Sequence, residues 1–206
     1  MRILDSDNYI NEKLNIQPIT KTRLSDIKAS SIVATNETIE EIVNEAIDKY
    51  GDNADLNFIL TYKVTYMPNL FANLSFNGDI SRWDVSNVVD MGGMFESSSF
   101  NGDISRWDVR NVETMAFMFN ESEFEGDISK WNVENVVNMY CMFANGCFNG
   151  DISDWRVSNV ENMCGMFSHS NFNGDLSKWK VKNDVDMSDM FVGSPLEHFE
   201  PAWYKE

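Results

Sequence analysis

The sequence FNGDISRWDV occupies residues 76–85 and is repeated letter for letter at residues 100–109. Related segments begin at residues 124, 148 and 172, so five copies follow one another at a constant interval of 24 residues. All six tryptophans of the chain fall on the same interval: Trp83, Trp107, Trp131, Trp155, Trp179 and Trp203. A fixed period of this length predicts units that cannot bury an apolar face alone and therefore stack on their neighbours.

We therefore predict a repeat solenoid with about 24 residues per coil. Its expected parts are a degenerate coil at 52–75, five clear coils at 76–195 and a partial coil at 196–206. Within one coil, residues 104–109 have the character of an extended segment. Met115, Met118 and Phe119 are spaced i, i+3, i+4, which predicts a short helical or 3₁₀ segment.

Two polar motifs predict the corners of each coil. Gly102 and Asp103 are expected to form one corner, because glycine tolerates positive φ and aspartate closes an Asx turn on nearby backbone N–H groups. The asparagine of each V-x-N-x-V segment is expected to satisfy backbone groups at a second corner. This row comprises Asn87, Asn111, Asn135 and Asn159, with Asn183 in the same register.

The region 31–51 predicts a helix at residues 38–50. Its apolar residues follow helical spacing from Ile39 to Tyr50, Thr38 and Glu41 form a capping-box motif, and Gly51 ends the segment. We expect this helix to cover the apolar end of the first coil, with a partner-binding helix as the alternative. Residues 1–30 form an N-terminal arm, either loosely packed or carrying a short motif that docks on a larger assembly such as a virion.

The repeat F-N-G-D-I-S-x-W-D-V-S-N-V-x-x-M-x-x-M-F closely resembles the BspA-like leucine-rich repeat of many bacterial surface proteins, over about residues 76–191. The resemblance implies a right-handed solenoid of α/β leucine-rich-repeat type whose members bind other macromolecules, often as adhesins, and it implies no catalytic residues. The first 24 residues lack the apolar core of a secretory signal. Because similar repeats occur in phage-coded proteins, we expect a cytoplasmic or virion-associated protein rather than one on the cell surface.

Charge limits the classes of partner. The chain carries a net charge of −17, and because residues 1–30 hold five basic and four acidic groups, the remainder carries −18. Such a surface repels nucleic acid and favours a protein partner with a basic surface. No apolar stretch reaches 18 residues, so no membrane span is expected. The sequence does not set the oligomeric state.

A ladder of aspartates follows the repeat: Asp79, Asp103, Asp127, Asp151 and Asp175. Carboxylates roughly 5 Å apart repel by roughly 0.8 kcal/mol per pair in a water-like dielectric. Corner N–H groups or the basic row formed by Arg82, Arg106, Lys130 and Lys178 are expected to offset this repulsion. A calcium ladder is the rival interpretation, but each coil supplies only one such carboxylate, so we expect no metal and no cofactor.

Neither cysteine nor histidine indicates chemistry. Cys141, Cys147 and Cys164 are odd in number and lack metal-binding spacing, so free thiols are expected. The two histidines, His169 and His198, lie in no motif with a nucleophile or a second ligand. No phosphate-binding, dinucleotide-binding or hydrolase motif occurs. We therefore expect no catalytic residues and predict that the protein is not an enzyme.

Binding is expected where the units differ. The two positions between the paired methionines vary most, and they place Phe117 and Tyr140 in adjacent coils on a predicted exposed strip. The alternative is that these two rings pack on each other or on the helix. A second variable row follows each tryptophan and changes from acidic to basic, which either orients a partner or reflects drift. It comprises Asp84, Asp108, Asn132, Arg156 and Lys180.

The predicted function is therefore non-catalytic protein binding through a solenoid face. One alternative is a structural, virion-associated component docked by residues 1–30. A second alternative is a cell-surface adhesin whose signal peptide was removed.

Overall fold

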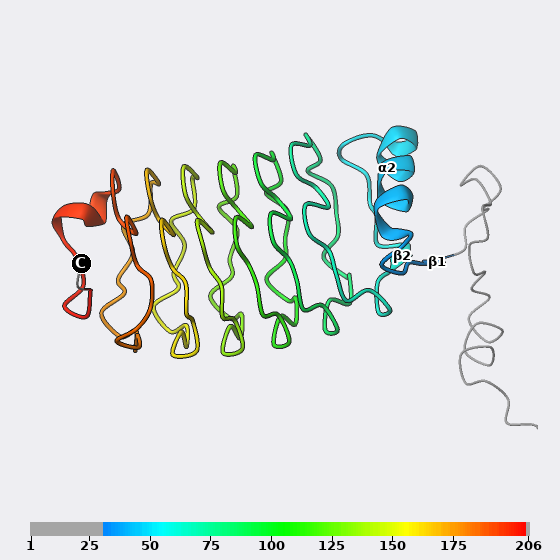
Figure 1. The fold of residues 1–206 in the computed structure, drawn as a ribbon. Coiled ribbons are helices and arrows are strands. Elements are labelled where there is room, and N and C mark those ends of the chain that lie inside the picture. The colour runs from blue at the N-terminus through cyan, green and yellow to red at the C-terminus, as the bar shows by residue number, and fades with distance from the viewer. Residues whose placement is uncertain (1–30, 205–206) are drawn as a thin grey trace, which may run out of the picture.

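A computed structural model of the protein describes residues 31–204. The arm predicted at residues 1–30 lies outside the described residues. The described elements are strand β1 (Ile32–Val33), helix α2 (Ile39–Tyr50), strand β2 (Ile59–Leu60) and the 3₁₀ helix η2 (Pro195–His198). Between β2 and η2 the chain winds in successive coils that lie side by side (Figure 1).

Parallel backbone hydrogen bonds join each coil to the next. The N–H groups of Met91, Gly93 and Phe95 donate to carbonyls 23 residues further on, at 3.1, 2.8 and 3.0 Å. Parallel bridges at the 24-residue interval run without a break from Tyr66–Asp90 to Asn162–Asp186. We call residues 52–195 the coil stack and propose that it is the predicted solenoid. Its right-handed winding and its leucine-rich-repeat class stay predictions.

Rows of phenylalanine fill the centre of the coil stack. Phe95 stacks on Phe119 of the next coil with ring centroids 5.6 Å apart, and Phe100 stacks on Phe124 at 6.4 Å. Within one coil, Phe95 and Phe100 lie 4.3 Å apart in nearly parallel planes. These rings are at most 1% exposed. Burial of such a side chain stabilises the fold by about 1.5–3 kcal/mol. Because each phenylalanine stacks on its copy in the next coil, the repeated residue forms a continuous core.

The short helical or 3₁₀ segment predicted in each coil is wrong, since these residues form turns. Around Met91 the chain makes successive turns, in which the N–H of Met94 donates to the carbonyl of Met91 at 3.2 Å. Gly93 within this turn has a φ of 62°. The N–H groups of Met91, Gly93 and Phe95 donate to the next coil, so they are not available for the α-helical hydrogen bond to the carbonyl four residues earlier. Turns stabilised between coils thus place Met91, Met94 and Phe95 inside without a helix.

The corner motif is half confirmed. The Asp103 carboxylate accepts the N–H of Ser105 at 3.0 Å, which is the expected Asx turn. Gly102, however, is not among the residues with positive φ. A Cβ at Gly102 would lie 2.8 Å from two ring carbons of Phe100, so this position requires glycine because the ring approaches closely.

The second corner forms as predicted. The Asn111 side-chain amide donates to the carbonyl of Ser86, 25 residues earlier, at 2.7 Å. Within the described residues Asn183 makes no such bond. The row that repeats this hydrogen bond comprises Asn87, Asn135 and Asn159, with the carbonyls of Tyr62, Arg110 and Glu134.

Helix α2 lies at the N-terminal end of the coil stack, beside the short parallel pair formed by β1 and β2 (Figure 1). Its buried face belongs to the same core as the coils, and Gly51 ends it with a φ of 86°. The predicted capping box is wrong. The Thr38 hydroxyl accepts the N–H of Thr35 at 3.0 Å, because a tight turn precedes the helix and occupies that oxygen.

The last residues cover the other end of the coil stack. After η2, Tyr204 lies edge-on to Phe191 with centroids 5.0 Å apart, and Trp203 stacks on Trp179 at 6.0 Å. These contacts place aromatic rings against the last phenylalanine and tryptophan of the core rows.

Candidate functional site

Phe117 and Tyr140 lie together on the surface of the coil stack. Their rings meet edge to face, with centroids 4.8 Å apart and planes at 85°. The N–H of Phe117 also donates to the carbonyl of Tyr140 at 2.8 Å. The rings therefore pack on each other, as the alternative prediction stated, yet both side chains stay partly exposed. We call these two residues the aromatic pair.

The backbone at Phe117 is left-handed, with a φ of 58°. A left-handed conformation costs an L residue roughly 1–2 kcal/mol, and a bulky side chain is rare there. Equivalent positions in other coils also have positive φ and carry mostly glycine or small polar residues: Asn69, Gly93, Cys141, Gly165 and Asp189. The prediction placed Phe117 outward on a helical turn. The side chain is partly exposed, but the predicted helical backbone conformation is wrong. Gly93 and Gly165 were the sequence signal for the true conformation.

Two thiols lie next to the aromatic pair. The N–H of Cys141 donates to the carbonyl of Cys164 at 3.0 Å, so the two residues lie in paired backbone of neighbouring coils. Both are free, as is Cys147. Partial burial raises the pKa of the Cys141 thiol, and a hydrogen bond with this thiol raises the pKa of the Tyr140 hydroxyl. Both groups are therefore protonated at neutral pH, which does not favour nucleophilic chemistry at the aromatic pair.

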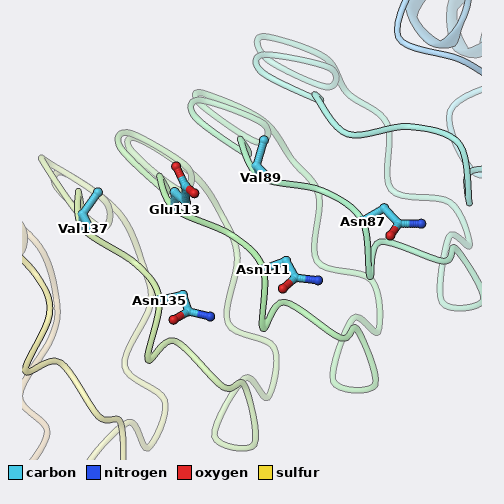
Figure 2. A pocket seen from close by; sticks show the side chains of 6 residues that line it. All are labelled: Asn87, Val89, Asn111, Glu113, Asn135 and Val137. Atoms are coloured by element: carbon cyan, nitrogen blue, oxygen red, sulfur yellow. The ribbon is translucent and has the colours of Figure 1, made fainter.

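A shallow groove crosses three coils on the side of the asparagine row (Figure 2). Its volume is about 510 Å³. The asparagine row forms one side, and the residues two positions further along each coil form the other. We call it the asparagine groove, and its lining comprises Asn87, Val89, Asn111, Glu113, Asn135 and Val137. Sequence reasoning treated these asparagines only as corner residues and missed the groove. The sequence feature that could have indicated it is the valine two residues after Asn87 and Asn135, at Val89 and Val137.

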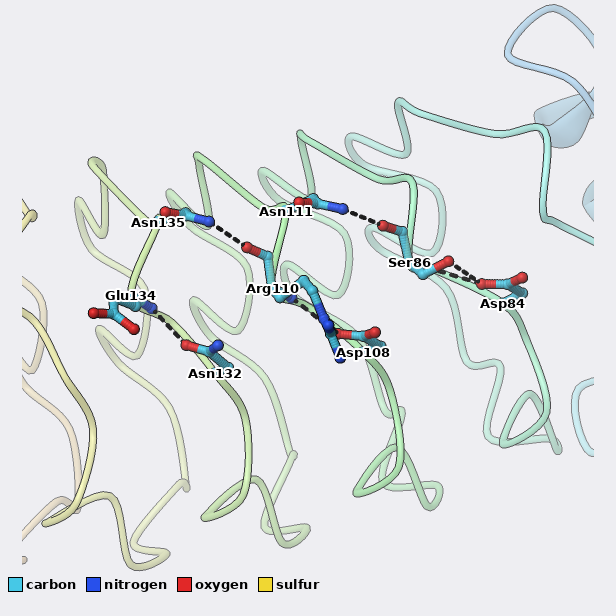
Figure 3. A network of polar contacts seen from close by, with 8 residues as sticks. All are labelled: Asp84, Ser86, Asp108, Arg110, Asn111, Asn132, Glu134 and Asn135. Atoms are coloured by element: carbon cyan, nitrogen blue, oxygen red, sulfur yellow. Dashed lines mark hydrogen bonds and ion pairs between the residues drawn. The ribbon is translucent and has the colours of Figure 1, made fainter.

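The row that follows each tryptophan closes turns beside this groove (Figure 3). The Asp84 carboxylate accepts both the N–H and the hydroxyl of Ser86, at 3.1 and 2.6 Å. Asp108 accepts the backbone N–H and the guanidinium of Arg110, at 3.3 and 2.8 Å. Asn132 makes the corresponding turn. The acidic end of the predicted gradient therefore has a structural role.

The basic end of the same row is exposed. Arg156 forms an ion pair with Glu134 of the preceding coil at 3.8 Å. Lys180 is exposed. The structure brings neither residue to the aromatic pair by any bond or ring contact within residues 31–204, so the predicted binding residues fall into two separate surfaces.

Hydrogen bonds stabilise the aspartate ladder. The N–H of Ser129 donates to Asp127 at 2.9 Å, and this bond is the main reason that the pKa of the Asp127 carboxyl is lowered. The neighbouring Lys130 lowers the pKa further, whereas Asp151 raises it. Across the described chain, no group of three or more His, Cys, Asp or Glu side chains is arranged to hold a metal ion.

Tandem units of 24 residues define this chain as a repeat protein. It belongs to the family described as "Mycoplasma protein of unknown function, DUF285", which matches residues 37–145 and again residues 100–200. Neither a curated protein nor a solved structure matches the chain. In the range 31–204, no helix is long and apolar enough to cross a membrane. The resemblance to BspA-like repeats stays a prediction.

Proposed function

We propose that this protein is a non-catalytic protein-binding module, in which the coil stack presents the aromatic pair to a partner. The observation that carries the proposal is the conformation of Phe117, a partly exposed phenylalanine held in left-handed backbone.

Residues held in strained backbone by the surrounding structure cluster at binding and functional sites. Gly93 and Gly165 occupy the same position without that strain, so the fold does not require a ring at Phe117. Aromatic side chains with rigid rings dominate the binding energy of many interfaces. A pair of rings that support each other edge to face loses little side-chain entropy on binding, which suits an anchor for a partner.

The test is capture of partners from the native lysate by the intact chain and by a Phe117→Gly, Tyr140→Ala double variant. Both substitutions introduce residues that neighbouring coils already carry, at Gly93 and Ala116, so the fold is retained. Partners held by the intact chain are expected to be lost from the double variant. Phe199→Ala is the control, because it removes an aromatic side chain that is 78% exposed after the last coil.

Equal capture by the intact chain and the double variant would contradict the proposal. A chain without residues 1–30 then tests the alternative that this segment docks the protein on a larger assembly.

A further inference from the structure

Hydrogen bonds fix the orientation of the asparagine amides in the asparagine groove. The side-chain amides of Asn87 and Asn111 donate to backbone carbonyls at 2.8 and 2.7 Å, and the amide of Asn135 does so at 2.7 Å. Because a carbonyl oxygen only accepts, the atom facing it is the amide nitrogen. The three amide oxygens therefore lie on the other side of the row, all in the same orientation (Figure 2).

These three oxygens are open acceptors. Among the described residues no donor makes a hydrogen bond to any of them, and all three asparagines are exposed. Their spacing is that of the coils, which pair as parallel strands do at about 4.8 Å. The asparagine row, which lines one side of the groove, thus carries a regular ladder of exposed hydrogen-bond acceptors.

The opposite side of the groove combines apolar surface with one negative charge. Val89 and Val137 are 39% and 38% exposed, and the exposed carboxylate of Glu113 lies between them in the same row. No basic side chain lines the groove. Arg110 follows the adjacent turn, but its guanidinium is paired with Asp108 at 2.8 Å (Figure 3).

We propose that the asparagine groove binds an extended basic segment of a protein partner, with lysine or arginine at alternate positions. The aliphatic stems of these side chains pack on Val89 and Val137, while the charged ends donate to the amide oxygens and to Glu113. Side chains on one face of an extended segment are about 7 Å apart, so two of them fit within three coils, about 10 Å.

The net charge of −18 outside residues 1–30 steers such a segment to the coil stack. The inference rests on the proposed function in that the partner is a protein, and it adds the partner's chemistry and a second contact surface.

The experiment is an NMR titration of the full chain with a short peptide of alternating lysine and glycine, at about 0.15 M salt, where long-range charge effects are screened. The same peptide with acetylated lysines is the ligand control. We expect the lysine peptide to shift the side-chain amide signals of Asn87, Asn111 and Asn135, and the acetylated peptide to leave them in place.

Two groove variants with opposite effects sharpen the test. Glu113→Val makes the row uniform with Val89 and Val137, whereas Val137→Glu copies Glu113 and Glu161 of the neighbouring coils. The first is expected to weaken peptide binding about threefold and the second to strengthen it about threefold, as one exposed ion pair allows.

The matched control is Glu125→Asn, which removes one negative charge from another surface and introduces the residue found at Asn101 and Asn149. Its expected effect on peptide binding is less than twofold. Equal weakening by Glu113→Val and Glu125→Asn, or shifts spread away from the asparagine row, would overturn the inference, as would equally strong binding of a free linear polyamine. The titration uses no aromatic-pair variant, so its failure and that of the lysate capture are distinguishable.

Discussion

The indole N–H of Trp107 donates to the backbone carbonyl of Ile80, 27 residues earlier, at 3.2 Å. Trp107 is 4% exposed and Ile80 is 1% exposed, so the bond is buried. The carbonyl of Ile80 also accepts the N–H of Trp83 at 3.1 Å, so the indole is a second donor to this buried carbonyl and joins each coil to the one before it. The same bond is made by Trp83, Trp131, Trp155, Trp179 and Trp203.

Replacement of a central tryptophan by phenylalanine tests this bond. Trp131→Phe removes one of the two hydrogen bonds that the buried carbonyl of Ile104 accepts, the other coming from the N–H of Trp107, and this costs about 0.5–1.5 kcal/mol in addition to the lost packing. We expect a lower free energy of unfolding, measured by urea denaturation followed with circular dichroism, and a lower unfolding temperature in calorimetry. Trp203→Phe is the control at the partly exposed end of the row, and an equal loss in both variants would contradict the argument.

The glycine of the FEGD segment is expected to be intolerant of a methyl group. A Cβ at Gly126 would lie 2.7 Å from two ring carbons of Phe124, so Gly126→Ala forces the stacked ring to move and costs about 1–3 kcal/mol. Thermal unfolding measures the loss. Gly92→Ala is the matched control, because the next coil has Ala116 at that position, and the prediction fails if both variants unfold at the same temperature.

The repeat predicted which side chains are buried but not how the backbone turns. A period of 24 residues identified the stacked positions, because a side chain that packs on its own copy must recur at the same place in every unit. Met115, Met118 and Phe119 have helical spacing and are buried as expected. The helix is absent because their backbone groups bond to other coils, and such bonds depend on residues 23 positions away.

The surfaces were less predictable than the core. Variation between units identified Phe117 and Tyr140, whose rings do lie together. The asparagine groove escaped prediction because Asn111 has a structural bond on one side of its amide and an open acceptor on the other, and sequence reasoning assigned only the first. The role of Asp108 in closing a turn was also missed, since the acidic residue was assessed for its charge alone.

The strain at Phe117 predicts an order of stability among its variants. With a φ of 58°, glycine is free of the steric cost that alanine still carries, so Phe117→Gly is expected to be about 1 kcal/mol more stable than Phe117→Ala. Both variants lose the same ring contact with Tyr140, so the comparison isolates the backbone. Chemical denaturation of the pair measures the difference, and an alanine variant as stable as the glycine variant would show that the position is unstrained.

The aspartate ladder predicts loss of stability in acid. Hydrogen bonds from the serine two residues later lower the pKa of the Asp127, Asp151 and Asp175 carboxyls in the folded protein. A group whose pKa is lowered on folding contributes stability above its unfolded pKa of about 4, and this contribution disappears as the pH falls through the folded pKa. The unfolding temperature is therefore expected to drop below about pH 4.

Replacement of Asp127, Asp151 and Asp175 by asparagine separates the effect of carboxyl protonation from the effect of losing the turn that each side chain closes. The asparagine side-chain oxygen still accepts the serine N–H, but it carries no proton to gain, so the triple variant is expected to lose less stability between neutral and acidic pH than the native chain. Calorimetric unfolding temperatures across that pH range measure both curves. If the unfolding temperatures of the two proteins fall in parallel with pH, the ladder makes no contribution to the acid sensitivity. The serine hydrogen bonds would then be equally strong to the ionised and to the protonated carboxyl groups.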